Sequence, residues 1–279
     1  MAIKDLLVAY DGSEGARTAL DVALQMGTKY QATVTALNVT VPAAYESHVS
    51  RWIPDNVKES MRTARLEATK AVEAKFREQI ATSGFTGDAQ WLVEEGLPDL
   101  TIARSARFFD MLIIGQFTSA FKREHRTVDP EELLHRTGKP LLIIPLGYKQ
   151  RPFKGQAAVA WDGSRHAARA LTDAMQILET KNRLAIISVK TDRKGADLAE
   201  LPGLDIAVHL KRHGVEAEHV HLRADHHNAG QVILDYCAQY DPDVLVMGAY
   251  GRAKFGVQIF GGVTRYILEH QNVPVLLSH

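Results

Sequence analysis

Short apolar runs alternate with longer amphipathic segments along the whole chain. The runs, such as the one from Asp243 to Met247, are rich in β-branched residues, which is typical of buried parallel strands. The segments between them place apolar residues at helical spacing. Strands that alternate with helices predict parallel βαβ units with right-handed crossovers, and therefore an α/β fold with helices on both faces of each sheet.

The pattern repeats once, which predicts two domains. Residues 7–13 read LVAYDGS and residues 158–164 read AVAWDGS, and an alanine-rich helical segment follows each copy. Each half also contains a later strand that ends in glycine, at Gly115 or Gly248, and then a closing apolar strand. We therefore expect each half to form an open doubly wound sheet.

A linker and two closing strands define the expected halves. The polar stretch from Gly147 to Gly155 is typical of an exposed linker, so we expect domains at residues 1–147 and 155–279. Pro140 and Pro274 stand near the starts of the closing strands, where a missing N–H donor does least harm. We predict that these two edges pair antiparallel within the chain, forming an intrachain pseudo-dimer that covers both edges.

The stretch from Gly248 to Thr264 is the best candidate for ligand chemistry. Gly248 and Gly251 follow a buried strand and leave room near the backbone, and Gly261-Gly262 opens a new helical pattern. Backbone N–H groups at a helix N-terminus attract anions, and Arg252 adds positive charge. The spacing predicts a phosphate site; the alternative is a crossover whose glycines only ease a tight turn.

The first half lacks these features. After Gly115 it has Gln-Phe-Thr118 in place of the second glycine, and residues 128–132 read VDPEE where the second half has its paired glycines. Acidic residues there suit the helix dipole but repel phosphate. We therefore expect the anion site in the second half alone.

The first half also carries an insertion. Most of its surplus length lies between Val41 and Ser60, before an amphipathic pattern from Met61 to Ile80. We interpret the insertion as a mobile or partner-facing loop that continues into a long helix.

Composition limits the classes of function. Lys plus Arg and Asp plus Glu each number 33, so no global field favours nucleic acid or an anionic membrane. The N-terminus is too charged and too briefly apolar for a signal peptide, and no run reaches membrane length, so we expect a cytoplasmic protein. The single cysteine, Cys237, excludes an intrachain disulfide and lies at an apolar helical position that predicts burial.

Histidines are concentrated in the second half, where six of the twelve fall between His209 and His227. His209 and His213 would share a helix face, and His219 and His221 would share one side of a strand. Either pair has ligands that suit zinc. Since no carboxylate pattern completes a site, solvated histidines are the simpler interpretation and we expect no metal.

The motifs resemble those of a known family. An Asp-Gly-Ser after the first strand, a Gly-x-x-Gly after the fourth, nine residues and then Gly-Gly-Val-Thr, and a closing Val-Pro-Val strand resemble the tandem form of the universal stress protein family. The likeness covers nearly the whole chain. It implies two flavodoxin-like or Rossmann-like domains, each with a five-stranded parallel sheet, and ATP as the ligand. With one degenerate loop, the expected stoichiometry is one ATP per chain.

The resemblance also implies roles for individual residues. Ala160 and Val189 would flank the adenine, and Asp162 would contact the ribose. The residues implied around the phosphates are Gly248, Gly251, Arg252, Gly261, Gly262, Val263 and Thr264. Gly262 departs from the family pattern, which has Ser or Thr there, and a lost hydroxyl bond to a charged phosphate costs about 1.5 to 3 kcal/mol. Thr264 is the candidate to compensate.

Asp162 and its counterpart Asp11 have a second interpretation. A carboxylate at the carboxyl end of the first strand of an α/β sheet is where ribose hydroxyls bind. Each aspartate could instead be the N-cap of the following helix. We favour the ligand role for Asp162 and the cap role for Asp11.

No catalytic motif accompanies the candidate site. Nucleotide hydrolysis needs a positioned water or base and usually a metal, and the sequence contains no P-loop. We expect a stress-response protein that senses an adenine nucleotide, with at most slow ATPase activity. The alternatives are a nucleotide-independent scaffold that binds a partner protein through residues 41–60, and a nucleotide-dependent enzyme. Further association into a homodimer stays open.

Overall fold

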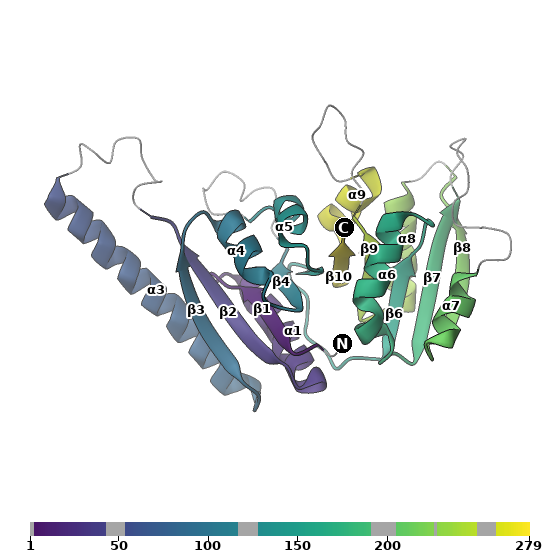
Figure 1. The fold of residues 1–279 in the computed structure, drawn as a ribbon, viewed down its shortest axis with the longest axis horizontal. Helices are drawn as coiled ribbons and strands as arrows, with labels where there is room; N and C mark the ends of the chain where they lie inside the picture. The colour runs from purple at the N-terminus through teal and green to yellow at the C-terminus, as the bar shows by residue number, and fades with distance from the viewer. Residues whose placement is uncertain (1–2, 43–53, 117–127, 191–204, 226–227, 250–260) are drawn as a thin grey trace. The chain divides into compact units, whose positions relative to one another are not determined.

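The computed structural model describes residues 3–42, 54–116, 128–190, 205–225, 228–249 and 261–279 (Figure 1). It divides into two compact units, which we call the first unit (Ile3–Lys139) and the second unit (Pro140–His279).

The described part of the first unit contains a parallel sheet with the strand order β3-β2-β1-β4. Leu7 of β1 lies opposite Thr35 of β2 and Leu112 of β4. Four consecutive residues of β1 are buried, which requires cover on both faces of the sheet. The strands are β1 (Asp5–Ala9), β2 (Thr33–Thr40), β3 (Ala89–Glu95) and β4 (Met111–Gly115). The helices are α1 (Glu14–Tyr30), α3 (Asp55–Ser83), α4 (Pro98–Ala106) and α5 (Pro130–Thr137).

The second unit has the strand order β5-β10-β9-β6-β7-β8 in its described residues. Neighbouring strands are parallel except for β5 and β10. The strands are β5 (Leu141–Ile144), β6 (Gln156–Ala160), β7 (Arg183–Lys190), β8 (Ala217–Arg223), β9 (Val244–Gly248) and β10 (Val275–Ser278). The helices are α6 (Arg165–Leu178), α7 (Ile206–Arg212), α8 (Ala229–Tyr240) and α9 (Gly262–His270). The alternation of strands and helices in the two units confirms the predicted α/β fold.

The two closing strands pair as predicted. Val275 of β10 lies opposite Ile143 of β5 in an antiparallel ladder. Pro140 and Pro274 directly precede these strands, so neither removes a ladder hydrogen bond. The pairing places β5 in the second unit, although the sequence repeat assigns this strand to the first half. The domain limits 1–147 and 155–279 stay a prediction.

Helix α3 starts earlier than the amphipathic pattern predicts. It begins at Asp55, so the last part of the predicted loop is helical. The hydrophobic pattern missed this part because its side chains are exposed and carry no apolar stripe. Residues 43–53 of that loop lie outside the described residues.

The carboxyl-terminal part of α3 is anchored to the first unit by two buried residues, Phe76 and Gln79. The ring of Phe76 lies 6.0 Å from that of Tyr10 and 5.3 Å from that of Trp91. The side-chain amide of Gln79 donates to the carbonyl of Arg17 on α1 at 2.7 Å. These contacts fix one end of a 29-residue helix against the sheet.

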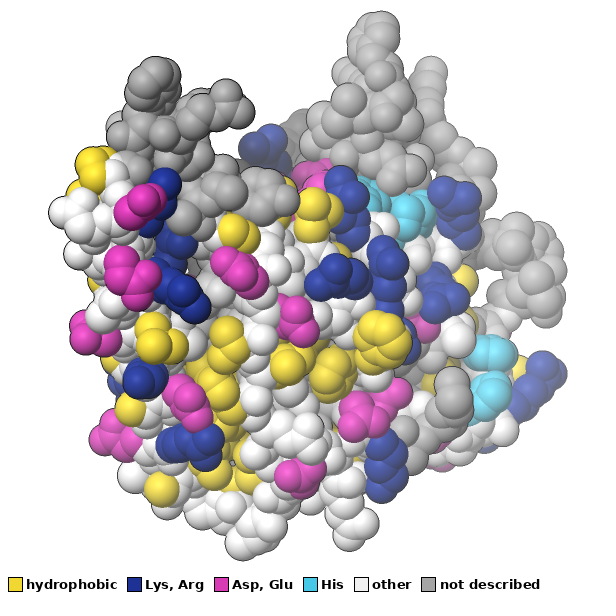
Figure 2. All heavy atoms as spheres, turned by 60° about the vertical axis from the view of Figure 1, so that its left-hand side comes forward, with side chains coloured by type: hydrophobic (Ala, Val, Ile, Leu, Met, Phe, Trp, Pro, Cys, Tyr) yellow, Lys and Arg dark blue, Asp and Glu magenta, His cyan; other side chains and the backbone are white. Residues whose placement is uncertain are grey.

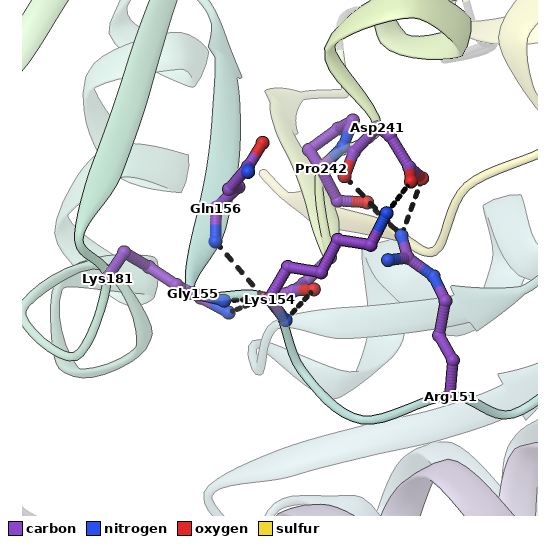
Figure 3. A network of polar contacts seen from close by, with 8 residues as sticks. Arg151, Lys154, Gly155, Gln156, Lys181, Asp241 and Pro242 are labelled. Carbon is purple, nitrogen blue, oxygen red and sulfur yellow. Dashed lines mark hydrogen bonds and ion pairs between the residues drawn. The ribbon is translucent and has the colours of Figure 1, made fainter.

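The linker predicted as exposed is anchored at its end by polar contacts of Lys154 and Gly155 (Figure 3). Asp243 Oδ1 accepts from the backbone N–H of Lys154 at 2.8 Å, and Oδ2 accepts from that of Gly155 at 2.9 Å. The Lys181 ammonium lies 2.8 Å from Oδ2, and both side chains of this ion pair are 3% exposed. Burial alone would raise the pKa of Asp243, but Lys181 and the backbone donors outweigh it and lower the pKa. The sequence indicated only that the linker is polar, whereas the structure shows that its end is fixed by hydrogen bonds to Asp243.

The molecular surface carries charges of both signs. On the face shown in Figure 2, acidic and basic side chains are mixed with apolar ones, in keeping with their equal numbers in the sequence. None of the helices in the described ranges combines the length and apolarity needed to span a membrane.

Candidate functional site

The Asp-Gly-Ser motif forms the same turn in both units. Asp162 Oδ1 accepts from Ser164 N at 2.9 Å, and Ser164 Oγ accepts from Ala167 N at 3.2 Å. Gly163 has a φ of 71°, a conformation that L side chains rarely adopt, so glycine is required between the two. The first unit repeats the arrangement with Asp11 and Ser13.

This geometry corrects the N-cap interpretation of the two aspartates. The N-caps are Ser13 and Ser164, because the cap must directly precede the first helical residue. Each aspartate instead orders the turn from two residues upstream. Asp162 is exposed, and among the described residues its second oxygen has no hydrogen-bond partner. The ribose contact of Asp162 stays a prediction.

The two residues predicted to flank adenine lie on adjacent strands of the second unit. Ala160 ends β6 and pairs with Ile187 of β7, two residues before Val189. Both Ala160 and Val189 are half-buried at the carboxyl ends of their strands. The structure therefore brings this pair to the sheet edge where α/β folds bind ligands.

A histidine that the site prediction did not include lies on the neighbouring strand β8. His219 Nε2 of β8 is 2.9 Å from Ser188 Oγ of β7, and that hydroxyl also donates to the Trp161 carbonyl at 3.1 Å. The rings of His219 and His221 stack with centroids 4.3 Å apart, which confirms that they share one side of the strand. The sequence showed only that His219 and His221 share one side of a strand, and the contact with Ser188 depends on the register of β8 against β7.

The histidines do not assemble a metal centre in the described part of the chain. His209 lies in α7 and His213 is its C-cap, and their ring centroids lie 4.8 Å apart, close together as predicted. Within the described ranges, no group of three or more His, Cys, Asp or Glu residues is placed to hold a metal ion. His226 and His227 lie outside those ranges.

Gly248 has a packing role that the sequence did not reveal. A Cβ at this position would lie 2.6 Å from Ala167 N of α6, and closer still to the carbonyl carbon of His166. A Cβ added to Gly115 of the first unit would likewise press on the backbone of α1, 2.8 Å from Gly15 Cα. Both strands need glycine because a helix backbone crosses their ends. A phosphate contact by Gly248 stays a prediction.

Among the described residues, no side chain caps the N-terminus of α9. Its N-cap is Gly261, and within the described ranges no side chain makes a capping hydrogen bond there. A Cβ on Gly262 would meet no atom of the described residues within 4 Å. Val263 is half-buried, whereas Thr264 is only 2% exposed, so little of its surface is available to replace the missing hydroxyl. Gly251 and Arg252 lie outside the described residues.

The corresponding helix end in the first unit is already occupied by carboxylates. Asp129 is the N-cap of α5, and its Oδ1 accepts from Glu131 N at 2.9 Å. Asp99, the second residue of α4, accepts from Asp129 N at 3.0 Å. Burial of Asp99 raises the pKa of its carboxyl group. The second residue of α8 is Gly230, so the second unit has no carboxylate at this place.

The buried cysteine is not a nucleophile. Cys237 is 2% exposed, and burial raises the pKa of its thiol to about 12. The thiolate is the reactive form, so this residue fills the core, as predicted.

The first unit contains a cavity of about 190 Å³ that sequence reasoning did not predict. It lies at the carboxyl ends of β1 and β2 and is bounded by α3 and α4. The residues that line it are Ala9, Tyr10, Asp11, Leu37, Asn38, Val39, Thr40, Val41, Arg65, Ala68, Thr69, Val72, Pro98, Ile102 and Val128. Ala9 and Val39 are the first-unit counterparts of Ala160 and Val189.

Comparisons of the sequence with known proteins all point to one family. A sequence profile of the universal stress protein family matches residues 2–145 and again residues 156–279. Universal stress protein Slr1230 of Synechocystis sp. is 26% identical over 299 residues, which cover 98% of this chain and 99% of that protein.

Solved structures show the same architecture. A universal stress protein from Archaeoglobus fulgidus DSM 4304 has a TM-score of 0.73 at 18% identity, over 98% of this chain and 97% of its own. Protein PA1789 of Pseudomonas aeruginosa PAO1, described as functionally unknown, has a TM-score of 0.59 at 16% identity. The match covers 99% of this chain and 92% of that protein. At these identities the likeness is one of fold.

Proposed function

The chain belongs to the universal stress protein family in its tandem form, and on that premise we propose that its second half binds one adenine nucleotide. We further propose that the protein is a cytoplasmic ligand sensor of the stress response, not a metabolic catalyst.

The contrast between two helix N-termini carries this proposal. At α5 the backbone donors of Asp129 and Glu131 are taken by the protein's own carboxylates. At α9 no side chain of the described residues caps the helix, and none of their atoms fills the space around Gly262. A helix N-terminus of this kind attracts phosphate through its free N–H groups and its dipole. The anion site is therefore proposed for the second half alone.

The remaining contacts follow the family resemblance. Adenine would lie at Ala160 and Val189, and the ribose would meet the free carboxylate oxygen of Asp162. The backbone of Gly261 and Gly262 would receive the phosphates. Catalysis is not needed for such a role, and we expect ATP turnover far below the roughly 1 to 10³ per second of ordinary enzymes.

Calorimetric titration with ATP tests the proposal. The wild-type chain should bind one ATP, and Gly261→Asp should weaken binding at least tenfold, because it gives α9 the acidic N-cap that α5 has. Aspartate is a favourable N-cap, so this substitution should not lower the melting temperature. The matched control is Asp129→Gly, which should leave the ATP affinity unchanged.

Two results would contradict the proposal. One is an ATP affinity that Gly261→Asp does not change, and the other is a stoichiometry of two sites per chain.

A nucleotide-independent scaffold is the second candidate. The observation that favours it is the exposed surface of α3, where Val57 is 41% and Leu66 is 56% exposed. Mass spectrometry of molecules released from freshly purified protein separates the two functions, since the scaffold would release no stoichiometric nucleotide.

A further inference from the structure

The cavity of the first unit has the dimensions of a small-molecule site. At about 190 Å³ it is somewhat larger than an engineered apolar protein cavity of about 150 Å³ that binds benzene. It therefore has room for a molecule of one or two rings.

Its lining is mostly apolar. Nine of the fifteen lining residues are alanine, valine, leucine, isoleucine or proline. They come from the strand ends, from α3 and from α4, so apolar side chains surround the space on several sides.

The polar lining side chains are largely committed to the protein. Asn38 Nδ2 donates to the Tyr10 carbonyl at 2.9 Å, and Thr69 Oγ1 donates to the Arg65 carbonyl at 3.0 Å. The two charged residues of the lining, Asp11 and Arg65, have opposite signs, so the lining has no net charge. Little in this lining would repay the desolvation of a charged ligand.

The neighbouring helix end does not accept a phosphate either. Asp99 and Asp129 already occupy the N-terminus of α5, and a phosphate placed there would face both carboxylates. The first unit thus keeps a ring-sized cavity while the adjoining anion site is filled.

We propose that this cavity binds a compact, uncharged and largely apolar ring compound, a class distinct from the nucleotide proposed for the second half. The inference stands whether or not the second half binds ATP.

Indole is a suitable probe because it is uncharged and has two fused rings. The full-length chain is first saturated with ATP, so that any site in the second half is filled. Methyl signals are then followed by NMR during the indole titration. The Ile102 methyl signals should shift, whereas those of Ile143, a buried residue of β5 outside the lining, should not.

Two matched substitutions on α3 locate the site. Both alanines are exposed, but Ala68 lines the cavity and Ala74 lies outside the lining. Ala68→Phe should weaken indole binding at least tenfold, and Ala74→Phe should leave it unchanged. Val72→Phe fills the cavity from one helical turn further along and should reproduce the loss if Ala68→Phe folds poorly.

The last experiment compares indole with charged analogues. Indole-3-acetate carries an anionic group and tryptamine a cationic one, and both should bind at least tenfold more weakly than indole. The proposal is overturned if Ile102 does not respond to indole at millimolar concentration, if neither cavity-filling variant weakens binding, or if a charged analogue binds as tightly.

Discussion

Replacing Asp243 by asparagine removes the negative charge from the buried pair with Lys181 and keeps the size of the side chain. The ammonium of Lys181 would then stay 3% exposed without its counter-charge. Removing one partner of a buried ion pair costs about 3 to 5 kcal/mol, a large part of the roughly 5 to 15 kcal/mol by which domains are stable. At about 2 to 4 °C per kcal/mol, the melting temperature should fall by roughly 6 to 20 °C.

The matched control is Asp110→Asn in the first unit. Asp110 accepts from the backbone N–H groups of Lys4 and Asp5 at 2.7 and 3.0 Å, as Asp243 accepts from those of Lys154 and Gly155. Among the described residues it has no ion-pair partner like Lys181, so the amide oxygen should replace most of its function. Urea unfolding followed by circular dichroism measures both variants. A cost for Asp243→Asn no larger than that of Asp110→Asn would refute the role given to the buried pair.

The stability that Asp243 contributes should also depend on pH in a defined direction. The pKa of Asp243 is lowered in the folded protein, so its contribution is fully present above the unfolded value of about 3.9. That contribution is lost as the pH falls through the folded pKa. The difference in unfolding free energy between wild type and Asp243→Asn should therefore be constant from neutral pH to about pH 5 and shrink below about pH 4.

Three further predictions address the glycine positions and the cysteine. Gly262→Ser should tighten ATP binding by about one to two decades in a calorimetric titration, because a hydroxyl bond to a charged group contributes about 1.5 to 3 kcal/mol; unchanged affinity would separate this residue from the phosphates. Gly248→Ala should lower the melting temperature even without ligand, since its Cβ would press on the backbone of α6, and a neutral effect in thermal unfolding would exclude the packing role. Cys237 should resist alkylation by iodoacetamide in the native protein at pH 8 and react once it is unfolded, because burial raises its pKa to about 12; rapid native labelling would contradict this.

Hydrophobic periodicity was sufficient to predict the α/β fold, and the prolines near the closing strands, together with the need to cover two sheet edges, predicted the pairing of those strands. Apolar runs and helical segments alternate in the order of a doubly wound sheet, and the prolines of the closing strands stand just outside the ladder. These features are local, so they can be recognised in the sequence without knowing which residues meet.

The details of the site depend on contacts between distant segments, and here the sequence was ambiguous. Glycine at position 248 is compatible with a ligand or with a crossing helix, and only the structure shows the backbone of α6 against it. Aspartate and serine are both good N-caps, so the motif did not reveal that Ser164 caps the helix while Asp162 orders the turn. The cavity was missed because it requires α3 and α4 to lie over the ends of β1 and β2.

The antiparallel ladder between β5 and β10 has a consequence for the order of folding. Ile143 and Val275 are about 130 residues apart in the chain, so this contact closes late during synthesis. Until β10 is made, an apolar edge of β5 stays unpaired, and unpaired edges of this kind recruit strands from other chains. A nascent or truncated chain that stops before Val275 should therefore aggregate through β5, and the release of β10 from the ribosome ends this period of exposure.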